Sequence, residues 1–479
     1  MAAAVCGGEL RSPPYVFYTD LVIPLFFWYI KINGVFCVAG RDVRIAPRLQ
    51  KILYFRCGAD VAPYFQQKRR PLSMNKKNVL VAQSGGPSSA INATLAGVIE
   101  QAFISGKVDK VYGARYGIKG VLNDWIIDAG APVRSPRALL NLIHTPASAL
   151  GTCRHKLKNE DSDPDSYKII FERFAQYNIG YFVYIGGNDS ADTTNKLSKY
   201  AAANGIEVYI MGAPKTIDND LYGMDHSPGY GSAAKYIATT FSEIWCDARV
   251  YDIPTVTIVE TMGRHVGWLC AASAVARKTG EAPHLIYLPE IPFDDNKFLE
   301  DVKEQMARHP AVVIAVSEGI KRADGGYVCE DESNVKVDAF GHKHMGGACR
   351  VLEALIADNM ECKMRSIELS LLQRCAGHLA SSVDLAEAKA LGAMAMNKAL
   401  AGVSGEIPVL NRVSDDPYIV EYGTVLATTI ANMEKAVPRE WINERGNFVT
   451  EDFIRYVTPL LGGPFGSDIT SGYPQHFNF

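Results

Sequence analysis

Charged side chains gather in the heptapeptide PKTIDND at 214–220, which begins one residue after the apolar stretch VYIMG at 208–212. Asp218 and Asp220 alternate along the chain, so in an extended segment their carboxylates point to the same side. Asp and Asn also cluster in ordinary turns. Lys215, three residues before Asp218, either forms a structural ion pair or neutralises a phosphate. Such a stretch at the tip of a strand is difficult to explain as a plain loop, so it favours a role in phosphate chemistry.

Two glycine-rich stretches point to the same chemistry. QSGGPSS at 83–89 contains Gly85 and Gly86, and GGNDS at 186–190 repeats the arrangement after another apolar run. Glycines here serve either a tight turn with positive φ or a phosphate held by backbone N–H groups and a following helix N-terminus. Asp189 is either a helix N-cap or, beside a phosphate, a ligand of Mg²⁺.

Further polar candidates follow other apolar runs or lie in helix-forming segments. They are Glu260, Met262, Arg264, His265, Glu318, Arg154, Arg365 and Arg374. The planar fork of an arginine suits phosphate or hydroxyl-rich ligands, although a lone arginine is most often a solvated surface charge. Among Arg154, Arg365 and Arg374, we expect Arg374 to be the most buried. His265 is either a base or, as we expect, a packed or surface residue.

Short apolar runs that alternate with helical stretches predict the fold class. The expected strands are NVLVA (78–82), YFVYI (181–185), VYIMG (208–212), TVTIV (255–259), HLIYL (284–288) and VVIAV (312–316). One predicted helix presents Ile91, Leu95, Val98, Ile99 and Ala102 on a single face, and residues 347–402 are rich in helix formers. Such alternation predicts a doubly wound parallel α/β architecture. Polar clusters follow five of these strands, so we expect one crevice at their carboxyl ends.

Composition excludes several classes of function. A net charge of −3 over 479 residues gives no basic excess for nucleic acid. The ten cysteines form no CxxC pair, which favours the reduced thiols of a cytoplasmic protein over a zinc site. The apolar run VIPLFFWYI (22–30) is too short to span a membrane, and the chain lacks a basic signal-peptide start. We expect residues 1–73 to be a dispensable extension or translated upstream sequence.

Five motifs in this order resemble the phosphofructokinase family: strand–SGG–helix, GGNDS, PKTIDND, ETMGRHVGW and SEG. The resemblance runs from about Asn78 to at least Arg374. It implies two doubly wound parallel-sheet lobes that face a central cleft. Residues 74–229 with about 373–435 would form the phosphoryl-donor lobe, and residues 230–372 with about 436–479 the fructose 6-phosphate lobe.

Two positions decide which branch of that family the chain resembles. ATP-using members carry glycine where this chain has Asp189 and Lys215, whereas pyrophosphate-using members carry Asp and Lys. An Asp side chain fills and repels the space of an ATP α-phosphate, and a Lys ammonium reaches the small pyrophosphate. The effect exceeds the roughly 1–3 kcal/mol of one methylene in a pocket. The resemblance is therefore to the pyrophosphate-dependent branch.

The resemblance also implies roles for individual residues. Asp218 would be the general base for the C1 hydroxyl of fructose 6-phosphate, with Lys215 and Asp189 as further catalytic groups. Pyrophosphate would be bound by Gly85, Gly86, Lys215 and Arg154. The sugar would be bound by Thr216, Asp218, Asp220, Met262, Gly263, Arg264 and Glu318. Arg365 and Arg374 would bind the 6-phosphate or the transferring group, and Asn188 and Asp189 would bind Mg²⁺.

Three positions depart from the family pattern. Asn188 replaces the usual metal-binding Asp, Leu371 replaces a histidine, and Thr255 replaces an arginine donated across subunits. The last two argue against the familiar allosteric tetramer, so we expect a homodimer, with a homotetramer as the alternative. We expect a cytoplasmic enzyme that binds neither nucleic acid nor membrane. The alternatives are an ATP-dependent enzyme, a related substrate such as sedoheptulose 7-phosphate, and a non-catalytic sugar-phosphate-binding subunit.

Overall fold

The computed structural model describes residues 29–32, 35–38, 76–329, 347–431 and 433–462. The chain divides into two compact units, Met1–Asp60 and Val61–Phe479. In the first unit, strands β1 (Tyr29–Ile32) and β2 (Val35–Val38) form an antiparallel pair. Most of the apolar run 22–30, and most of the extension predicted for residues 1–73, lies outside the described residues.

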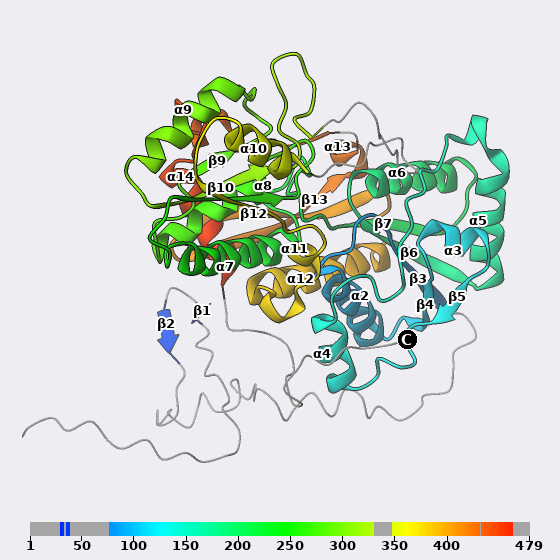
Figure 1. Cartoon of the computed structure of the whole chain (residues 1–479). Helices are drawn as coiled ribbons and strands as arrows, with labels where there is room; N and C mark the ends of the chain where they lie inside the picture. Colours follow the sequence, from blue (N-terminus) through cyan, green and yellow to red (C-terminus); the bar gives the residue numbers. More distant parts are fainter. Residues whose placement is uncertain (1–28, 33–34, 39–75, 330–346, 432, 463–479) are drawn as a thin grey trace, which may run out of the picture. The chain divides into compact units, whose positions relative to one another are not determined.

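A five-stranded sheet forms the first half of the second unit (Figure 1). Its order is β5 (Ile126–Asp128), β4 (Val108–Ala114), β3 (Lys77–Gln83), β6 (Ile179–Gly186) and β7 (Tyr209–Pro214). All neighbours are parallel except the β4–β5 pair. Val79 and Val81 of β3 pack in one apolar layer, whereas Leu80 and Ala82 pack in the other. The sheet is therefore buried on both faces, as continuous apolar strands predict.

Helices cover both faces of this sheet. The layer around Val79 contains α2 (Ile91–Ser105), α4 (Pro136–His144) and α12 (Ser382–Leu400). The opposite layer contains α3 (Ile118–Leu122), α5 (Pro164–Gln176) and α6 (Asn188–Ala203).

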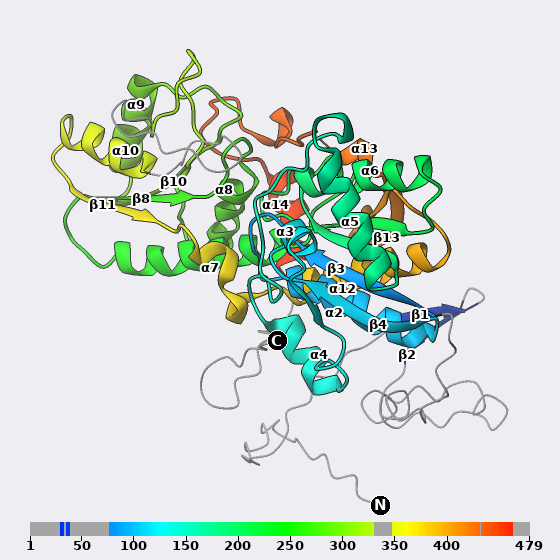
Figure 2. The same cartoon turned by 90° about the vertical axis from the view of Figure 1, so that its right-hand side faces the viewer.

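A second, four-stranded sheet is entirely parallel. Its order is β11 (Lys363–Glu368), β8 (Thr255–Thr261), β10 (Ala311–Ser317) and β9 (Leu285–Tyr287). Figure 2 labels β11, β8 and β10. One face packs against α7 (Tyr230–Ala248), α8 (Trp268–Ala272) and α14 (Glu451–Val457). The other face packs against α9 (Asp295–Met306) and α10 (Ala348–Ala357).

The remaining elements are short or form a separate ribbon. Strands β12 (Glu406–Asp415) and β13 (Tyr418–Leu426) pair antiparallel, with a bulge between Arg412 and Ser414. The short helices are α11 (Leu372–Cys375), α13 (Ala427–Ile430), and the 3-10 turns η1 (Glu160–Ser162), η2 (Ser273–Lys278), η3 (Gly377–Leu379), η4 (Arg439–Trp441) and η5 (Thr458–Leu461).

Local sequence signals explain where several helices begin and end. The Ser135 hydroxyl accepts the N–H of Ala138 at 3.1 Å, and Pro136 opens α4. Such a cap, with proline in the first turn, is a strong start signal. Helix α2 ends at Gly106, whose φ of +63° suits glycine.

The structure confirms the predicted fold class and each strand predicted from an apolar run. All five residues of the predicted helix face lie buried in α2. The apolar runs did not reveal β4, β5, β11 or the β12–β13 ribbon. Among the described residues, no helix is both long and apolar enough to cross a membrane.

Candidate active site

A cleft of about 990 Å³ opens at the carboxyl ends of strands from both sheets. The segments that follow β3, β6, β7, β8 and β10 all contribute lining residues. These are the five polar clusters that the sequence predicted to meet in one crevice. Every predicted site residue lines the cleft except Gly263 and Arg365.

Two cations converge on the glycine turn that follows β3. Lys215 Nζ donates to the Gly86 carbonyl at 2.5 Å and lies 3.2 Å from where a Cβ on Gly85 would stand. Arg374 Nη1 lies 3.4 Å from the corresponding Cβ position on Gly86. Gly85 has a φ of +75°, which favours glycine. A side chain at either position would enter the space beside these cations.

The turn differs from a simple helix N-terminal phosphate site. The Gly85 N–H points to the Cys153 carbonyl at 3.4 Å, and α2 begins only at Ile91. Helix α6, by contrast, begins directly at Asn188, in the cleft. Positive charge beside the glycines therefore comes mainly from the side chains of Lys215 and Arg374.

Lys215 is a buried side chain whose pKa lies only slightly above neutral pH. Its side chain is almost inaccessible, with 2% exposure. Burial lowers the pKa of Lys215 to about 8, although the nearby Asp218 carboxylate opposes this shift. A bound polyanion would favour the charged form further.

The segment with the paired carboxylates bends rather than runs extended. Asn219 has a φ of +59°, and the Asp218 N–H donates to Thr216 Oγ1 at 3.1 Å. Asp218 and Asp220 still both line the cleft. The expected outcome was correct, but the extended geometry on which it was based was wrong: a left-handed Asn219 brings the two carboxylates to the cleft. Burial raises the pKa of Asp218, while the charges of Lys215 and Arg264 oppose the rise.

Asn188 and Asp220 present two unused oxygen atoms. Asn188 Nδ2 donates to Asp220 Oδ2 at 3.3 Å. The Oδ1 atom of each residue is buried and has no hydrogen-bond partner among the described residues. Burial and the neighbouring Asp218 raise the pKa of Asp220 to about 7. Buried oxygens without a donor suit a bound divalent cation.

Asp189 stands at a more open place in the cleft. Its carboxylate lies 3.6 Å from Lys156 Nζ, and 43% of the Asp189 side chain is exposed. The pair holds a negative group beside the first turn of α6. Asp189 can therefore repel a further phosphate without being sequestered from solvent.

The second sheet contributes a more acidic part of the lining. The N–H of Gly263 points to Glu318 Oε1 at 3.4 Å, so Gly263 adjoins the cleft through its backbone. Burial and the charge of Asp218 raise the pKa of Glu318 to about 7. Arg264 lines the cleft, and its buried Nε has no partner among the described residues. These groups can bind hydroxyl or phosphate oxygens.

Arg365 lies outside the cleft residues. It extends from β11 and donates to Asp247 at 2.9 Å and to the Tyr251 hydroxyl at 3.2 Å. Arg154 and Arg374 both line the cleft. Arg374 is half-buried, but Arg365 is half-buried too, so burial does not single out Arg374 as predicted.

Sequence reasoning missed several cleft residues. Lys156 directly follows Arg154 and His155 in a short basic run, which was a usable signal. Glu434 comes from a C-terminal segment with no strong pattern, and it accepts a hydrogen bond at 2.9 Å from His265 if that ring nitrogen carries the proton. His265 is exposed, as expected of a surface histidine, and it also lines the cleft.

The lining carries more carboxylates than cations. Five Lys and Arg residues face seven Asp and Glu residues. The burial-raised pKa values of Asp220 and Glu318 reduce this excess only in part. A polyanionic substrate would therefore need accompanying cations.

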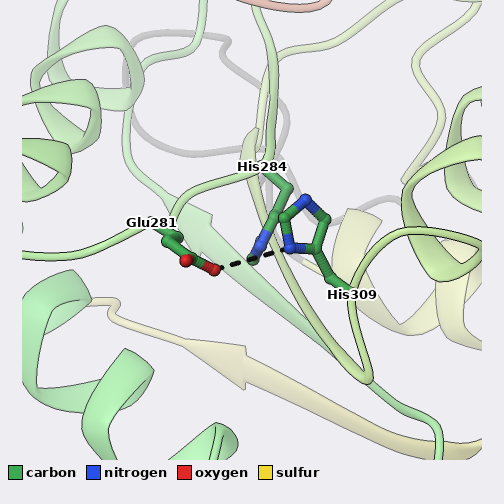
Figure 3. Close-up of side chains that lie close together, drawn as sticks. All are labelled: Glu281, His284 and His309. Atoms are coloured by element: carbon green, nitrogen blue, oxygen red, sulfur yellow. Dashed lines mark ion pairs between the residues drawn. The ribbon is translucent and has the colours of Figure 1, made fainter.

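A cluster outside the cleft also groups metal-ligand side chains. Ligand atoms of Glu281, His284 and His309 lie within 4.8 Å of one another (Figure 3). The N–H of Val313 donates to His284 Nδ1 at 3.0 Å, so the neutral ring carries its proton on Nε2. That nitrogen has no lone pair for a metal, and burial lowers the pKa of His284 to about 4. We therefore assign no metal to this cluster.

Comparison with known proteins agrees with this geometry. A family model described as Phosphofructokinase matches residues 78–399. Pyrophosphate–fructose 6-phosphate 1-phosphotransferases of Halomonas elongata and Xanthomonas campestris pv. campestris are 39% and 40% identical to this chain. Each alignment covers 84% of this chain and 96% of the relative. The crystal structure of a pyrophosphate-dependent phosphofructokinase from Marinobacter aquaeolei superposes with a TM-score of 0.75 at 36% identity, covering 84% of this chain and 95% of that one. The chain belongs to the phosphofructokinase family.

Proposed function

We propose that the chain reversibly transfers a phosphoryl group from pyrophosphate to the C1 hydroxyl of fructose 6-phosphate, giving fructose 1,6-bisphosphate and phosphate. The observation that carries this proposal is the convergence of Lys215 and Arg374 on the Gly85–Gly86 turn. The half-buried carboxylate of Asp218 lines the same cleft. Paired cations suit a small polyanion, and such a carboxylate suits removal of a hydroxyl proton.

Pyrophosphate is the proposed donor because of Asp189 and Lys215. In ATP an α-phosphate and nucleoside follow the two terminal phosphates, and the Asp189 carboxylate would crowd and repel them. Lys215 adds the charge that a bare pyrophosphate needs. The cleft volume of about 990 Å³ does not discriminate between pyrophosphate and ATP, because pockets of roughly 300–1,000 Å³ accept many ligands. Selectivity therefore rests on the two side chains.

Proton removal falls to Asp218 in this proposal. Burial raises the pKa of Asp218, which makes the carboxylate a stronger base. Lys215, Arg264 and Arg374 oppose the rise and favour the ionised form. The same cations can absorb charge on the phosphoryl group, so the protein's part is positioning and electrostatics.

Fructose 6-phosphate would lie against the lining from the second sheet. Glu318 is the proposed acceptor for sugar hydroxyls, and Met262, Gly263 and Arg264 complete the sugar site. Arg374 can reach either substrate phosphate. Phosphate binding by Arg365 stays a prediction, because within this chain the Arg365 guanidinium pairs with Asp247.

Mg²⁺ is the proposed cofactor, held by Asn188 with a carboxylate. The unpartnered Oδ1 atoms favour Asp220 as the companion of Asn188, whereas Asp189 faces Lys156. When bound, the ion would neutralise phosphate oxygens that the seven carboxylates of the cleft would otherwise repel.

The finer organisation is part of the same proposal. Residues 74–229 with about 373–435 would bind the donor, and residues 230–372 with about 436–479 the sugar phosphate. The two parallel sheets, within residues 77–214 and 255–368, support this division. We place the enzyme in the cytoplasm as a homodimer.

A donor comparison tests the proposal. The purified full chain would receive fructose 6-phosphate, Mg²⁺ and either pyrophosphate or ATP, with fructose 1,6-bisphosphate measured by a coupled assay. We expect kcat/KM to be at least about 100-fold higher with pyrophosphate. Equal use of ATP would refute the assigned donor. Absence of turnover with both donors would favour the non-catalytic sugar-phosphate-binding alternative. Sedoheptulose 7-phosphate as a second acceptor would test the sugar.

A further inference from the structure

A buried cluster of charges lies behind the loop that carries Asp218. His226 is 1% exposed, and its ring nitrogens lie 2.7 Å from Asp225 Oδ2 and 2.8 Å from Glu387 Oε2. Carboxylates on both sides mean that both nitrogens carry protons. Burial by itself lowers the pKa of His226, but the hydrogen bonds to Asp225 and Glu387 outweigh burial and raise it.

The ribbon β12–β13 closes this cluster. Arg412 of β12 places Nε and Nη2 at 3.1 and 3.0 Å from Asp225 Oδ2. The Tyr418 hydroxyl of β13 donates to Glu387 Oε1 at 2.7 Å. His226 and Arg412 thus face Asp225 and Glu387, and Arg412 also pairs with Asp415 at 2.8 Å. Such an arrangement is weak evidence for stability, because desolvation offsets the attraction, but it can fix a single geometry.

Hydrogen bonds connect the cluster to the residue between the two cleft carboxylates. Asn219 is fully buried, and its Oδ1 accepts the Ser227 N–H at 2.9 Å. Asn219 Nδ2 donates to the Tyr456 hydroxyl at 2.9 Å, which donates to the Asp225 carbonyl at 2.9 Å. The side chain of Asn219 is therefore clamped by the backbone on both sides of His226. The clamp holds Asn219 at its positive φ, which asparagine tolerates better than most residues.

We propose that the ion-pair cluster of Asp225, His226, Glu387 and Arg412 is a positioning device for phosphoryl transfer. It fixes residues 225–227, through them the side chain of Asn219, and thereby the direction of the Asp218 carboxylate. The inference rests on the proposed role of Asp218 as base.

The cluster lies outside the cleft and should affect phosphoryl transfer rather than substrate binding. None of its four residues is among the described residues that line the cleft, so substrate binding does not require them directly. Misplacement of a catalytic group by about 1 Å can cost 100-fold in rate. Loosening the clamp should therefore lower kcat far more than it changes either KM.

Tyr456→Phe tests the clamp with the smallest change. It removes the hydroxyl that joins Asn219 to the Asp225 carbonyl and leaves the ring packed against Trp268 and Trp441. We expect kcat to fall about 10- to 100-fold, with KM for both substrates changed less than about 3-fold.

Tyr287→Phe is the matched control. Tyr287 of β9 is also a buried tyrosine, and its hydroxyl donates to Asp301 of α9 at 2.9 Å. It is not among the described residues that line the cleft. We expect a comparable loss of thermal stability with kcat within about 2-fold of the unmodified chain.

Glu387→Gln and Glu387→Ala test the charged part of the cluster. Glutamine keeps one carbonyl acceptor for the His226 N–H, and its NH2 group can donate to the Tyr418 hydroxyl oxygen, so we expect it to retain at least about 5-fold more kcat than alanine. If Tyr456→Phe does not fold, these two variants still test whether the cluster positions Asp218.

Two results would overturn the inference while leaving the proposed function intact. One is Tyr456→Phe with the same kcat as Tyr287→Phe; the other is equal kcat for the two Glu387 variants. Absence of pyrophosphate-dependent turnover in the unmodified chain would instead overturn the proposed function.

Discussion

Lys215 and Asp218 lie three residues apart and influence each other's charge inside the cleft. Burial pushes the pKa of Lys215 down and that of Asp218 up, toward their neutral forms. Each also opposes the shift of the other. Binding of a polyanion or transfer of a proton in the cleft would therefore shift the protonation of both residues.

Removing the proposed base should affect turnover selectively. We expect Asp218→Asn to lower kcat by about 1,000-fold or more, because the amide cannot accept the hydroxyl proton. KM for fructose 6-phosphate should change little, since the side-chain volume is kept. Steady-state kinetics and a thermal melt measure both effects. A folded variant with kcat reduced less than 10-fold would contradict the role of Asp218.

The pKa of Lys215 predicts a pH dependence for donor binding. Below about pH 8 the ammonium is charged and attracts pyrophosphate; above it the amine is neutral. KM for pyrophosphate should therefore rise as pH increases past about 8. Lys215→Arg stays charged over this range, so its profile should be flatter between about pH 7 and 9. Ionisation of pyrophosphate is common to both proteins, so identical profiles would exclude Lys215 as the source.

Residue types predicted much of the cleft, but not its geometry. Lys215 and Asp218 were recognisable because charges follow an apolar strand within a compact motif. The contribution of Glu434 was not, because its segment has no periodic pattern and reaches the cleft only through tertiary packing. The left-handed Asn219 was equally hidden, since its conformation depends on the clamp from Ser227 and Tyr456.

At the scale of elements, apolar runs predicted the strands that are buried on both faces, such as β6 and β10. Strand β11 was missed because KMRSIE lacks an apolar run and none of its residues is fully buried. The ribbon β12–β13 was missed for a similar reason: much of β13 is exposed. These elements are set by pairing with distant strands, which local patterns do not encode.

The contact between α2 and α12 depends on two glycines. An added Cβ on Gly392 would lie 2.0 Å from the Thr94 carbonyl oxygen, and one on Gly97 would lie 2.0 Å from that of Lys389. The two helix backbones thus approach too closely for any side chain there. Figure 1 shows the two helices side by side. Their packing supports the five-stranded sheet, whose strand ends form one side of the cleft.

Gly392→Ala tests this helix contact. Helix propensity alone would make the change stabilising by about 1 kcal/mol. Because the helices must separate, we expect a net destabilisation of about 1–3 kcal/mol and a lower melting temperature. Denaturant unfolding measures the sign directly. An unchanged or higher free energy of unfolding would contradict the close approach.

At the scale of the whole molecule, the two parallel sheets carry complementary chemistry. Loops after the first sheet supply the glycine turn, Lys215 and Asp218, whereas loops after the second supply Arg264 and Glu318. Parallel strands bring all their carboxyl ends to one edge. This is why motifs far apart in the sequence meet in one cleft.

The extension at residues 1–73 should be unnecessary for this assembly. The first strand of the five-stranded sheet begins at Lys77, and Met1–Asp60 forms a separate compact unit. We expect a chain that begins at Met74 to keep the kcat and melting temperature of the full chain. A chain that begins at Gly85 lacks the central strand β3 and should not fold. Loss of activity in the chain that begins at Met74 would contradict the prediction that residues 1–73 are dispensable.

The central claim is that Asp189 and Lys215 select the phosphoryl donor. The most direct measurement is the ratio of kcat/KM for ATP to kcat/KM for pyrophosphate, in the unmodified chain and in the double variant Asp189→Gly, Lys215→Gly. Removing the repelling carboxylate and the pyrophosphate-binding ammonium should raise this ratio at least about 100-fold. An unchanged ratio in a folded, active double variant would contradict the account.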